Sequence, residues 1–150
     1  MNLLQHWDES LTGGLWFASW RAALADLTPA QAAWTPAPGR HSIWQILNHV
    51  TYWREVTIRK ARGDKVPTDD TELARENFRA PTARTAAAWK HDTDRFEAAH
   101  AALRALIADP STSVDPANTA TRADYHLTHD AHHLGQIMYL RAMQGLKPIE

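Results

Sequence analysis

The sequence predicts an all-α protein, and within that class a four-helix bundle. Apolar residues recur at spacings near three and four in four long stretches, which is the periodicity of amphipathic helices. Pro, Asp and Thr are concentrated between these stretches, where helix boundaries are expected. No stretch predicts a strand. At least two long connections favour an antiparallel bundle, and the order of its helices stays open.

The first stretch predicts a helix over residues 3–27. Gly13 and Gly14 weaken it, so the helix bends or begins there. A short helical turn follows, with Thr28 as its cap and Pro29 as its first residue, where the missing N–H of proline costs nothing.

The second helix is predicted from Ser42 to about Arg62. Ser42 and Gln45 fit a capping box, in which each side chain bonds an unpaired backbone amide of the other residue. Gly63 is suited to end the helix because glycine adopts the left-handed backbone conformation without steric cost.

The remaining elements follow from the same signals. A polar connection over 64–81 is predicted either to hold a helical turn near 72–77 or to shape one side of a pocket. A third helix is predicted from Thr82 or Thr85 to Ala108. After a loop over 111–121, a fourth helix is predicted over 122–144, ended by Gly145. The tryptophans predicted to fill the core are Trp16, Trp20, Trp44, Trp53 and Trp89. A basic group near the end of the second helix, explained by the helix dipole, comprises Arg54, Arg59, Lys60 and Arg62.

Composition narrows the functional classes. The 150 residues fit one domain, 1–150, large enough for a core without cross-links. Because the chain has no cysteine, disulfides, thiolate metal sites and a cysteine nucleophile are excluded. The net charge of -1 provides no basic field for nucleic acid, so none is expected as a partner. No membrane or targeting segment is predicted, and a cytoplasmic protein is expected.

Four of the nine histidines lie within eight residues of the fourth predicted helix: His126, His129, His132 and His133. His129 and His133 are four residues apart, so their side chains lie on one helix face, about 5–6 Å apart at Cβ. The same face carries Ile137 and Leu140, which directs both imidazoles into the bundle core. Two imidazoles at this spacing suit one metal ion. His132 is expected at the flank of this face.

A third ligand is expected from His49, at the inner edge of the second helix. Three histidines leave an open coordination position, which is typical of catalytic metal sites and not of closed structural ones. The alternative for all three is a set of core histidines bonded to carbonyls or water. The remaining histidines, His6, His41, His91 and His100, are predicted on the surface or in loops.

Three passages carry a family resemblance: residues 27–39, residues 42–50 with His49, and residues 129–137, which read His-Asp-Ala-His-His-Leu-Gly-Gln-Ile. In this order they resemble the DinB/YfiT-like superfamily of metal-binding four-helix bundles. The resemblance covers essentially the whole chain and implies that His49, His129 and His133 bind the metal. It also implies zinc or nickel as the metal and, in some members, mycothiol- or bacillithiol-dependent chemistry.

Four further residues are candidates for the surroundings of this site. For His126 three roles are open: a fourth ligand of the metal, a hydrogen-bonding partner of a ligand, or a polar residue at the mouth of the bundle. Gln136 bonds an imidazole or a water, or lies on the helix surface. Trp53, one turn beyond His49, forms an apolar wall or belongs to the core. Asp130 is a weaker candidate for orienting a histidine.

The leading functional hypothesis is a small metalloenzyme. Three neutral imidazoles leave a divalent metal its full charge, so it lowers the pKa of a water or thiol at the open position toward ~7. No general base is evident beside the histidines, which favours a thiol-dependent S-transferase acting on small electrophiles. The alternatives are a metal-dependent hydrolase and a non-catalytic metal-binding or dimerisation bundle. A small-molecule substrate and a homodimer are the expected partners.

Overall fold

The computed structural model describes residues 2–66 and 70–149. Its helices are α1 (Leu3–Thr12), α2 (Trp20–Leu24), α3 (Pro29–Ala32), α4 (Ile43–Arg62), α5 (Asp70–Glu76), α6 (Ala86–Ala108), the 3₁₀ turn η1 (Pro110–Thr112) and α7 (Pro116–Met143). The described residues contain no strand, which confirms the all-α prediction. None of the described helices is long and apolar enough to cross a membrane.

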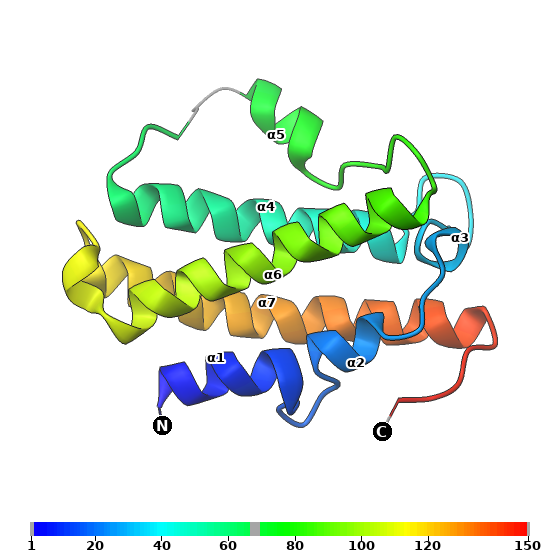
Figure 1. Cartoon of the computed structure of the whole chain (residues 1–150), viewed down its shortest axis with the longest axis horizontal. Coiled ribbons are helices and arrows are strands. Elements are labelled where there is room, and N and C mark those ends of the chain that lie inside the picture. The colour runs from blue at the N-terminus through cyan, green and yellow to red at the C-terminus, as the bar shows by residue number, and fades with distance from the viewer. Residues whose placement is uncertain (1, 67–69, 150) are drawn as a thin grey trace.

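The helices α1 and α2 follow one another along one side of the bundle, next to α7 (Figure 1). The helices α4 and α6 run in the same direction, and α7 runs against both. Trp44, at the start of α4, bonds Asp92, near the start of α6, which fixes this parallel pairing. The expectation of an antiparallel bundle, whose helix order was left open, is therefore wrong for this pair. The connection through α5 returns the chain to the end at which α4 began, as long crossovers do in other bundles.

The helix boundaries that rest on capping residues are confirmed. Thr28 and Ser42 both form complete capping boxes, with Gln31 and Gln45 respectively. Gly63 ends α4 in the left-handed conformation, with φ of 79°. Each box satisfies backbone amides that the first turn of a helix leaves unpaired.

The predicted helix over residues 3–27 is wrong in its middle. It is two helices, because Gly14 has φ of 79° and Ser19 caps a new helix at Trp20. A Cβ at Gly14 would lie 2.6 Å from the Phe17 carbonyl oxygen, so only glycine fits there. Trp16, predicted in the core, lies in this break and is fully exposed.

Two other boundaries also need correction. α7 begins at Pro116 and not at 122, because Asp115 caps it and Pro116 occupies its first turn. The predicted loop over 111–121 therefore ends at Asp115. Residues 67–69 of the predicted 64–81 connection lie outside the described residues, and the helical turn expected near 72–77 is α5.

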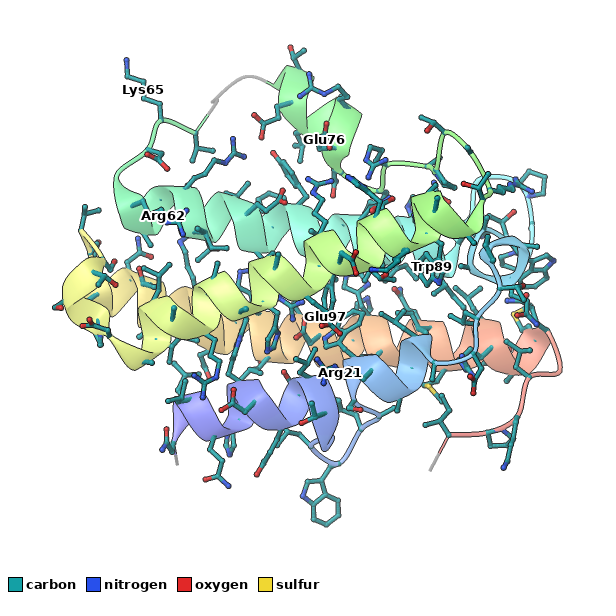
Figure 2. All side chains as sticks on the ribbon, viewed as in Figure 1. Arg21, Arg62, Lys65, Glu76, Trp89 and Glu97 are labelled. Carbon is teal, nitrogen blue, oxygen red and sulfur yellow. The ribbon has the colours of Figure 1, made fainter. Side chains whose placement is uncertain are left out.

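The apolar core consists of three clusters. The first gathers around Trp20, Leu47, Val50, Phe96 and Leu134, and the second around Trp7, Ile58, Leu103, Ala123 and Leu127. The third and smallest is formed by Ala32, Ala33 and Trp44. Trp44 is also fully buried, whereas Trp53 and Trp89 are half-buried. On the surface, Arg21 of α2 and Glu97 of α6 form a two-pronged ion pair (Figure 2).

A buried ion pair lies among the core aromatics. Arg54 and Asp130 have fully buried side chains, and Nη2 of Arg54 donates to Oδ2 of Asp130 over 2.6 Å. The guanidinium carbon lies 4.5 Å from the ring centre of Phe96 and 5.2 Å from that of Trp7, within range of cation–π attraction. Arg54 therefore belongs to the interior, and its assignment to the basic group near the end of the second helix is wrong.

His100 of α6, predicted on the surface, is buried as well. Its ring stacks on Trp7 with the centroids 4.6 Å apart. Burial, reinforced by the nearby positive charge of Arg54, lowers the pKa of His100 to about 3. The fold therefore holds this imidazole in its neutral form.

Acid is expected to destabilise the protein through His100. Its pKa lies below the ~6.5 of an unfolded histidine, so the unfolded state binds more protons between these values. The stability is fully present above pH 6.5 and is lost as the pH falls toward 3. His100→Phe should remove on the order of 2 kcal/mol of the stability loss between pH 7 and pH 5, measured by urea unfolding with chelator present. Equal pH dependence in wild type and His100→Phe would contradict the expectation.

Candidate metal centre

Three histidine side chains converge between α4 and α7. His49 lies on the second turn of α4, and His129 and His133 lie one turn apart in α7. Nε2 of His129 is 2.9 Å from Nε2 of His49 and 3.0 Å from Nε2 of His133. His49 and His133 are buried and His129 is half-buried. The antiparallel packing of α4 on α7 thus brings together residues 80 positions apart.

The outer nitrogens of two of these rings are held by amide oxygens. Nδ1 of His49 lies 2.5 Å from Oδ1 of Asn77, and Nδ1 of His133 lies 2.8 Å from Oε1 of Gln136. An amide oxygen only accepts, so each Nδ1 carries the proton and each Nε2 presents a lone pair to the centre. Nδ1 of His129 is buried and has no hydrogen-bond partner among the described residues.

These residues fit a metal ion. Two ligands of a tetrahedral metal with bonds of ~2.0–2.1 Å lie about 3.3–3.4 Å apart, close to the distances between these nitrogens. Without a cation, lone pairs would face each other at hydrogen-bond distance, and the one proton on His129 could satisfy only one neighbour. A divalent cation would satisfy all three.

The histidines are neutral at physiological pH, as metal ligands must be. Burial, helped by repulsion from the other imidazoles, lowers the pKa of His129 to about 3. Burial also lowers the pKa of His133 to about 4, and it lowers the pKa of His49 despite the bond to Asn77. Proton competition for these nitrogens is therefore weak near pH 7.

The other candidate residues have different places. His126 is buried, and its Nε2 lies 2.9 Å from the Thr57 hydroxyl, outside the group of three histidines. Asp130 forms an ion pair with Arg54, and no hydrogen bond of the described residues joins it to a histidine. Gln136 contacts His133, as above. Among the described residues, no fourth His, Cys, Asp or Glu joins the three histidines. A metal held by three protein ligands keeps a coordination position for a small molecule.

Trp53 and His126 share a pocket of about 290 Å³ with His129. The other lining residues are Val56, Thr57, Arg122 and Tyr125. The pocket lies between α4 and α7, beside the histidine cluster. An incoming molecule would therefore have a wall of mixed character that includes one of the three histidines.

Two residues of the site come from the connection before α6 and were not predicted individually. They are Asn77, whose bond to His49 is described above, and Phe78. The ring of Phe78 stacks on that of His49, with the centroids 3.9 Å apart. Its other face stacks on His41, also at 3.9 Å. The sequence signal was only the length of the 64–81 connection and its possible contact with a pocket. No motif marks an asparagine that will bond a distant histidine.

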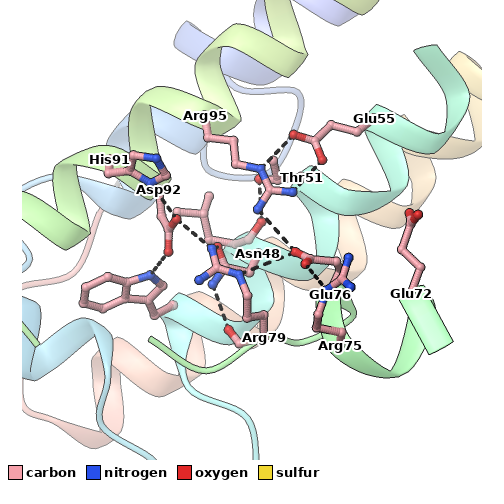
Figure 3. A network of polar contacts seen from close by, with 12 residues as sticks. Asn48, Thr51, Glu55, Glu72, Arg75, Glu76, Arg79, His91, Asp92 and Arg95 are labelled. Atoms are coloured by element: carbon pink, nitrogen blue, oxygen red, sulfur yellow. Dashed lines mark hydrogen bonds and ion pairs between the residues drawn. The ribbon is translucent and has the colours of Figure 1, made fainter. Parts of the chain in front are cut away.

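A polar network holds this connection in place (Figure 3). Nη2 of Arg79 donates to Asp92 over 2.7 Å, and Asp92 also accepts from the Trp44 indole. The side-chain amide of Asn48 donates to the Arg79 carbonyl over 2.8 Å. Phe78 has φ of 53°, an uncommon value for a bulky residue. The network fixes this conformation and with it the contacts of Phe78 and Asn77 with His49.

Asn77→Ala is expected to weaken metal binding about 10–100-fold, the usual cost of losing a residue that orients a ligand. His49 would lose the acceptor that fixes its proton on Nδ1. Competition with a chromophoric chelator measures the affinity. Asn77→Asp, which keeps an acceptor oxygen, is expected to retain it. Unchanged affinity in Asn77→Ala, with wild-type thermal stability, would show that Asn77 does not position His49.

The fold and the site define a class of protein: an all-helical bundle whose interior holds three convergent imidazoles able to bind a metal ion. A model of the DinB superfamily matches residues 16–137, and the chain belongs to this superfamily. The matched range includes all three histidines. Comparisons with curated proteins and with solved structures gave no match.

Proposed function

We propose that this protein is a metal-dependent enzyme that transfers a low-molecular-weight thiol to small electrophiles. The observation that carries the proposal is the convergence of three neutral imidazoles, with no fourth protein ligand among the described residues, beside a pocket. The metal, zinc or nickel, supplies a Lewis acid that lowers the pKa of a thiol toward neutrality. The chain, which has no cysteine, then needs no nucleophile of its own.

The protein residues have defined parts in this reaction. His49, His129 and His133 hold the metal, and Asn77 and Gln136 fix the protonation of two of them. Trp53 and Val56 provide an apolar wall that keeps the electrophile against the thiol. In the transfer, the sulfur lone pair forms a carbon–sulfur bond while the bond to the leaving group breaks. The thiol proton passes to solvent.

A hydrolase and a non-catalytic metal-binding or dimerisation bundle are the other candidates. Neither His126 nor Asp130 closes the site, because they are held by Thr57 and Arg54 respectively. This favours an enzyme over a closed structural site. A hydrolase needs a base to activate water. His126 lines the same pocket, but burial lowers its pKa to about 3, so it is a weak base near neutral pH, which favours the thiol reaction.

The test is an assay of the metal-loaded protein with several low-molecular-weight thiols and chlorodinitrobenzene, with the chelator-treated protein as control. Metal-dependent formation of the thioether is expected. An assay with nitrophenyl acetate and no thiol tests for hydrolysis. No rate above background with any thiol would count against the transferase, and metal-dependent hydrolysis alone would favour the alternative.

The proposal includes a cytoplasmic location and a homodimer. The cytoplasm keeps small thiols reduced, which a thiol-dependent enzyme requires. Tyr139 and Met143 remain exposed on α7 and offer apolar surface to a second copy. Sedimentation analysis of wild type and of Tyr139→Glu tests the dimer, which the substitution should dissociate. A monomeric wild type would exclude it.

A further inference from the structure

We propose that the pocket beside the histidine cluster binds a small organic carboxylate, with the carboxylate on Arg122 and the apolar body between Trp53 and Tyr125. This inference rests on the proposed function, because it names the substrate class of the same site. It concerns residues that lie outside the histidine cluster itself.

Arg122 differs from most arginines of the chain. The arginines that form ion pairs with carboxylates are Arg21, Arg54, Arg59, Arg75, Arg79, Arg95 and Arg104. Arg122 is in none of the ion pairs of the described residues. Its Nε donates to the neutral Asn118 over 3.1 Å, which orients the guanidinium and leaves its charge uncompensated. A guanidinium in this state is suited to bind a carboxylate.

The pocket has a charged end, an apolar middle and a metal-facing end. Arg122, His126 and His129 follow one another at spacings of four and three, so they lie along one face of α7. On the opposite side, Trp53 and Val56 of α4 continue the face that begins at His49. Arg122 is two turns from His129, about 10 Å along the helix axis. The ligand is therefore elongated, with its carboxylate at the end away from the histidines.

The size and lining of the pocket limit the ligand further. Its volume of about 290 Å³ is at the lower end for small-molecule sites, so the ligand is small. None of the described residues that line it is acidic, and both charged groups expected there, Arg122 and a bound metal, are positive. Trp53 is half-buried and Tyr125 is 66% exposed, so aromatic surface is open to an apolar body.

The test compares 2-naphthoate with 2-naphthamide, which share a shape and differ in charge, by calorimetry on the metal-loaded protein. Naphthoate is expected to bind about ten-fold more tightly or better, the usual effect of a hydrogen-bonded charge pair. Arg122→Gln should abolish this preference and keep the metal. Arg84→Gln, which removes the same charge from an exposed loop position, should keep the preference.

Equal binding of the two probes to the wild type would overturn the inference, as would an unchanged preference in Arg122→Gln. Metal analysis of each sample separates this outcome from failure of the proposed function. A metal-free protein that still prefers naphthoate through Arg122 would contradict the metalloenzyme and leave the carboxylate pocket standing. A metal-loaded protein that does not prefer naphthoate would contradict the carboxylate pocket and leave the metalloenzyme standing.

The carboxylate could belong to the electrophile or to the thiol. Mercaptohexanoate distinguishes them, with hexanoate and mercaptohexanol as its controls. If the thiol carries the carboxylate, mercaptohexanoate displaces naphthoate far better than either control. If the electrophile carries it, mercaptohexanoate and hexanoate displace naphthoate equally. Both results place a carboxylate on Arg122, and displacement by mercaptohexanol alone would overturn the inference.

Discussion

His129→Ala is expected to abolish metal binding, from about one metal per chain to none. His129 is the central member of the cluster, because its Nε2 faces those of both His49 and His133 at 2.9 and 3.0 Å. Its loss leaves two imidazoles, on different helices, which is fewer than the three protein ligands typical of a catalytic zinc site. Elemental analysis of protein purified without an affinity tag measures the loss, and His49→Ala and His133→Ala should behave alike.

Two neighbouring histidines provide matched controls. His132 is exposed and adjacent to His133, so His132→Ala removes an imidazole from the same helix and should leave the metal content unchanged. His126→Ala should also keep the metal, since Thr57 holds that ring. A wild type that contains no metal and binds none when it is added back would contradict the metal centre. If His126→Ala lost the metal and the variants of His49, His129 and His133 kept it, the metal site would have to include His126 in place of these three histidines.

Asp130→Ala is expected to destabilise the protein by about 3–5 kcal/mol, the usual cost of leaving a buried charge without its partner. Nη2 of Arg54 would lose its 2.6 Å bond to Asp130 inside a fully buried environment. The aromatic rings around the guanidinium would compensate for only part of this loss. A domain of this size has only about 5–15 kcal/mol of stability in total, so the variant is close to unfolding.

Chelator-treated proteins are compared by urea unfolding, so that metal does not enter the comparison. The double variant Arg54→Met, Asp130→Leu should recover most of the loss, because apolar residues can replace a buried ion pair. The control is Glu97→Ala, which breaks the exposed pair with Arg21 and should cost no more than about 1 kcal/mol. A loss in Asp130→Ala no greater than in this control would show that Arg54 finds another partner.

The elements that the sequence predicted well are those with local chemical signals. Thr28 with Gln31, Ser42 with Gln45, and Gly63 each act within one turn of their own backbone. Capping and left-handed termination depend on neighbours three or four residues away, so tertiary packing changes them little. The histidines of α7 are similar, because helical spacing alone puts His129 and His133 on one face.

The errors arose where composition and local conformation conflict. Residues 116–121 read as loop because Pro, Asn and Thr are poor helix formers, yet Asp115 and Pro116 start α7 there. Trp16 read as core because its size and spacing fit a helical face. The left-handed residues at 14 and 16 turn the chain and expose its ring instead.

Long-range contacts limited the prediction of the site. Asn77 reaches His49 across 28 residues, and Arg54 reaches Asp130 across 76. Neither pairing follows from periodicity, because each depends on how the crossover and the helices pack. The parallel course of α4 and α6 was likewise outside local signals. His49 was expected from its place on the inner edge of the second predicted helix, and the family resemblance agreed with it. The residues that surround His49 could be found only from the structure.

The sequence separation of the histidines has a consequence for folding. His49 and His129 are 80 residues apart, so an ion held between them would cross-link a loop that spans more than half of a chain without cysteines. In the chain-entropy description, a covalent cross-link of that span stabilises by on the order of 4 kcal/mol. The unfolding midpoint would then rise with the concentration of free metal, so that metal supply would set the stability of the folded chain.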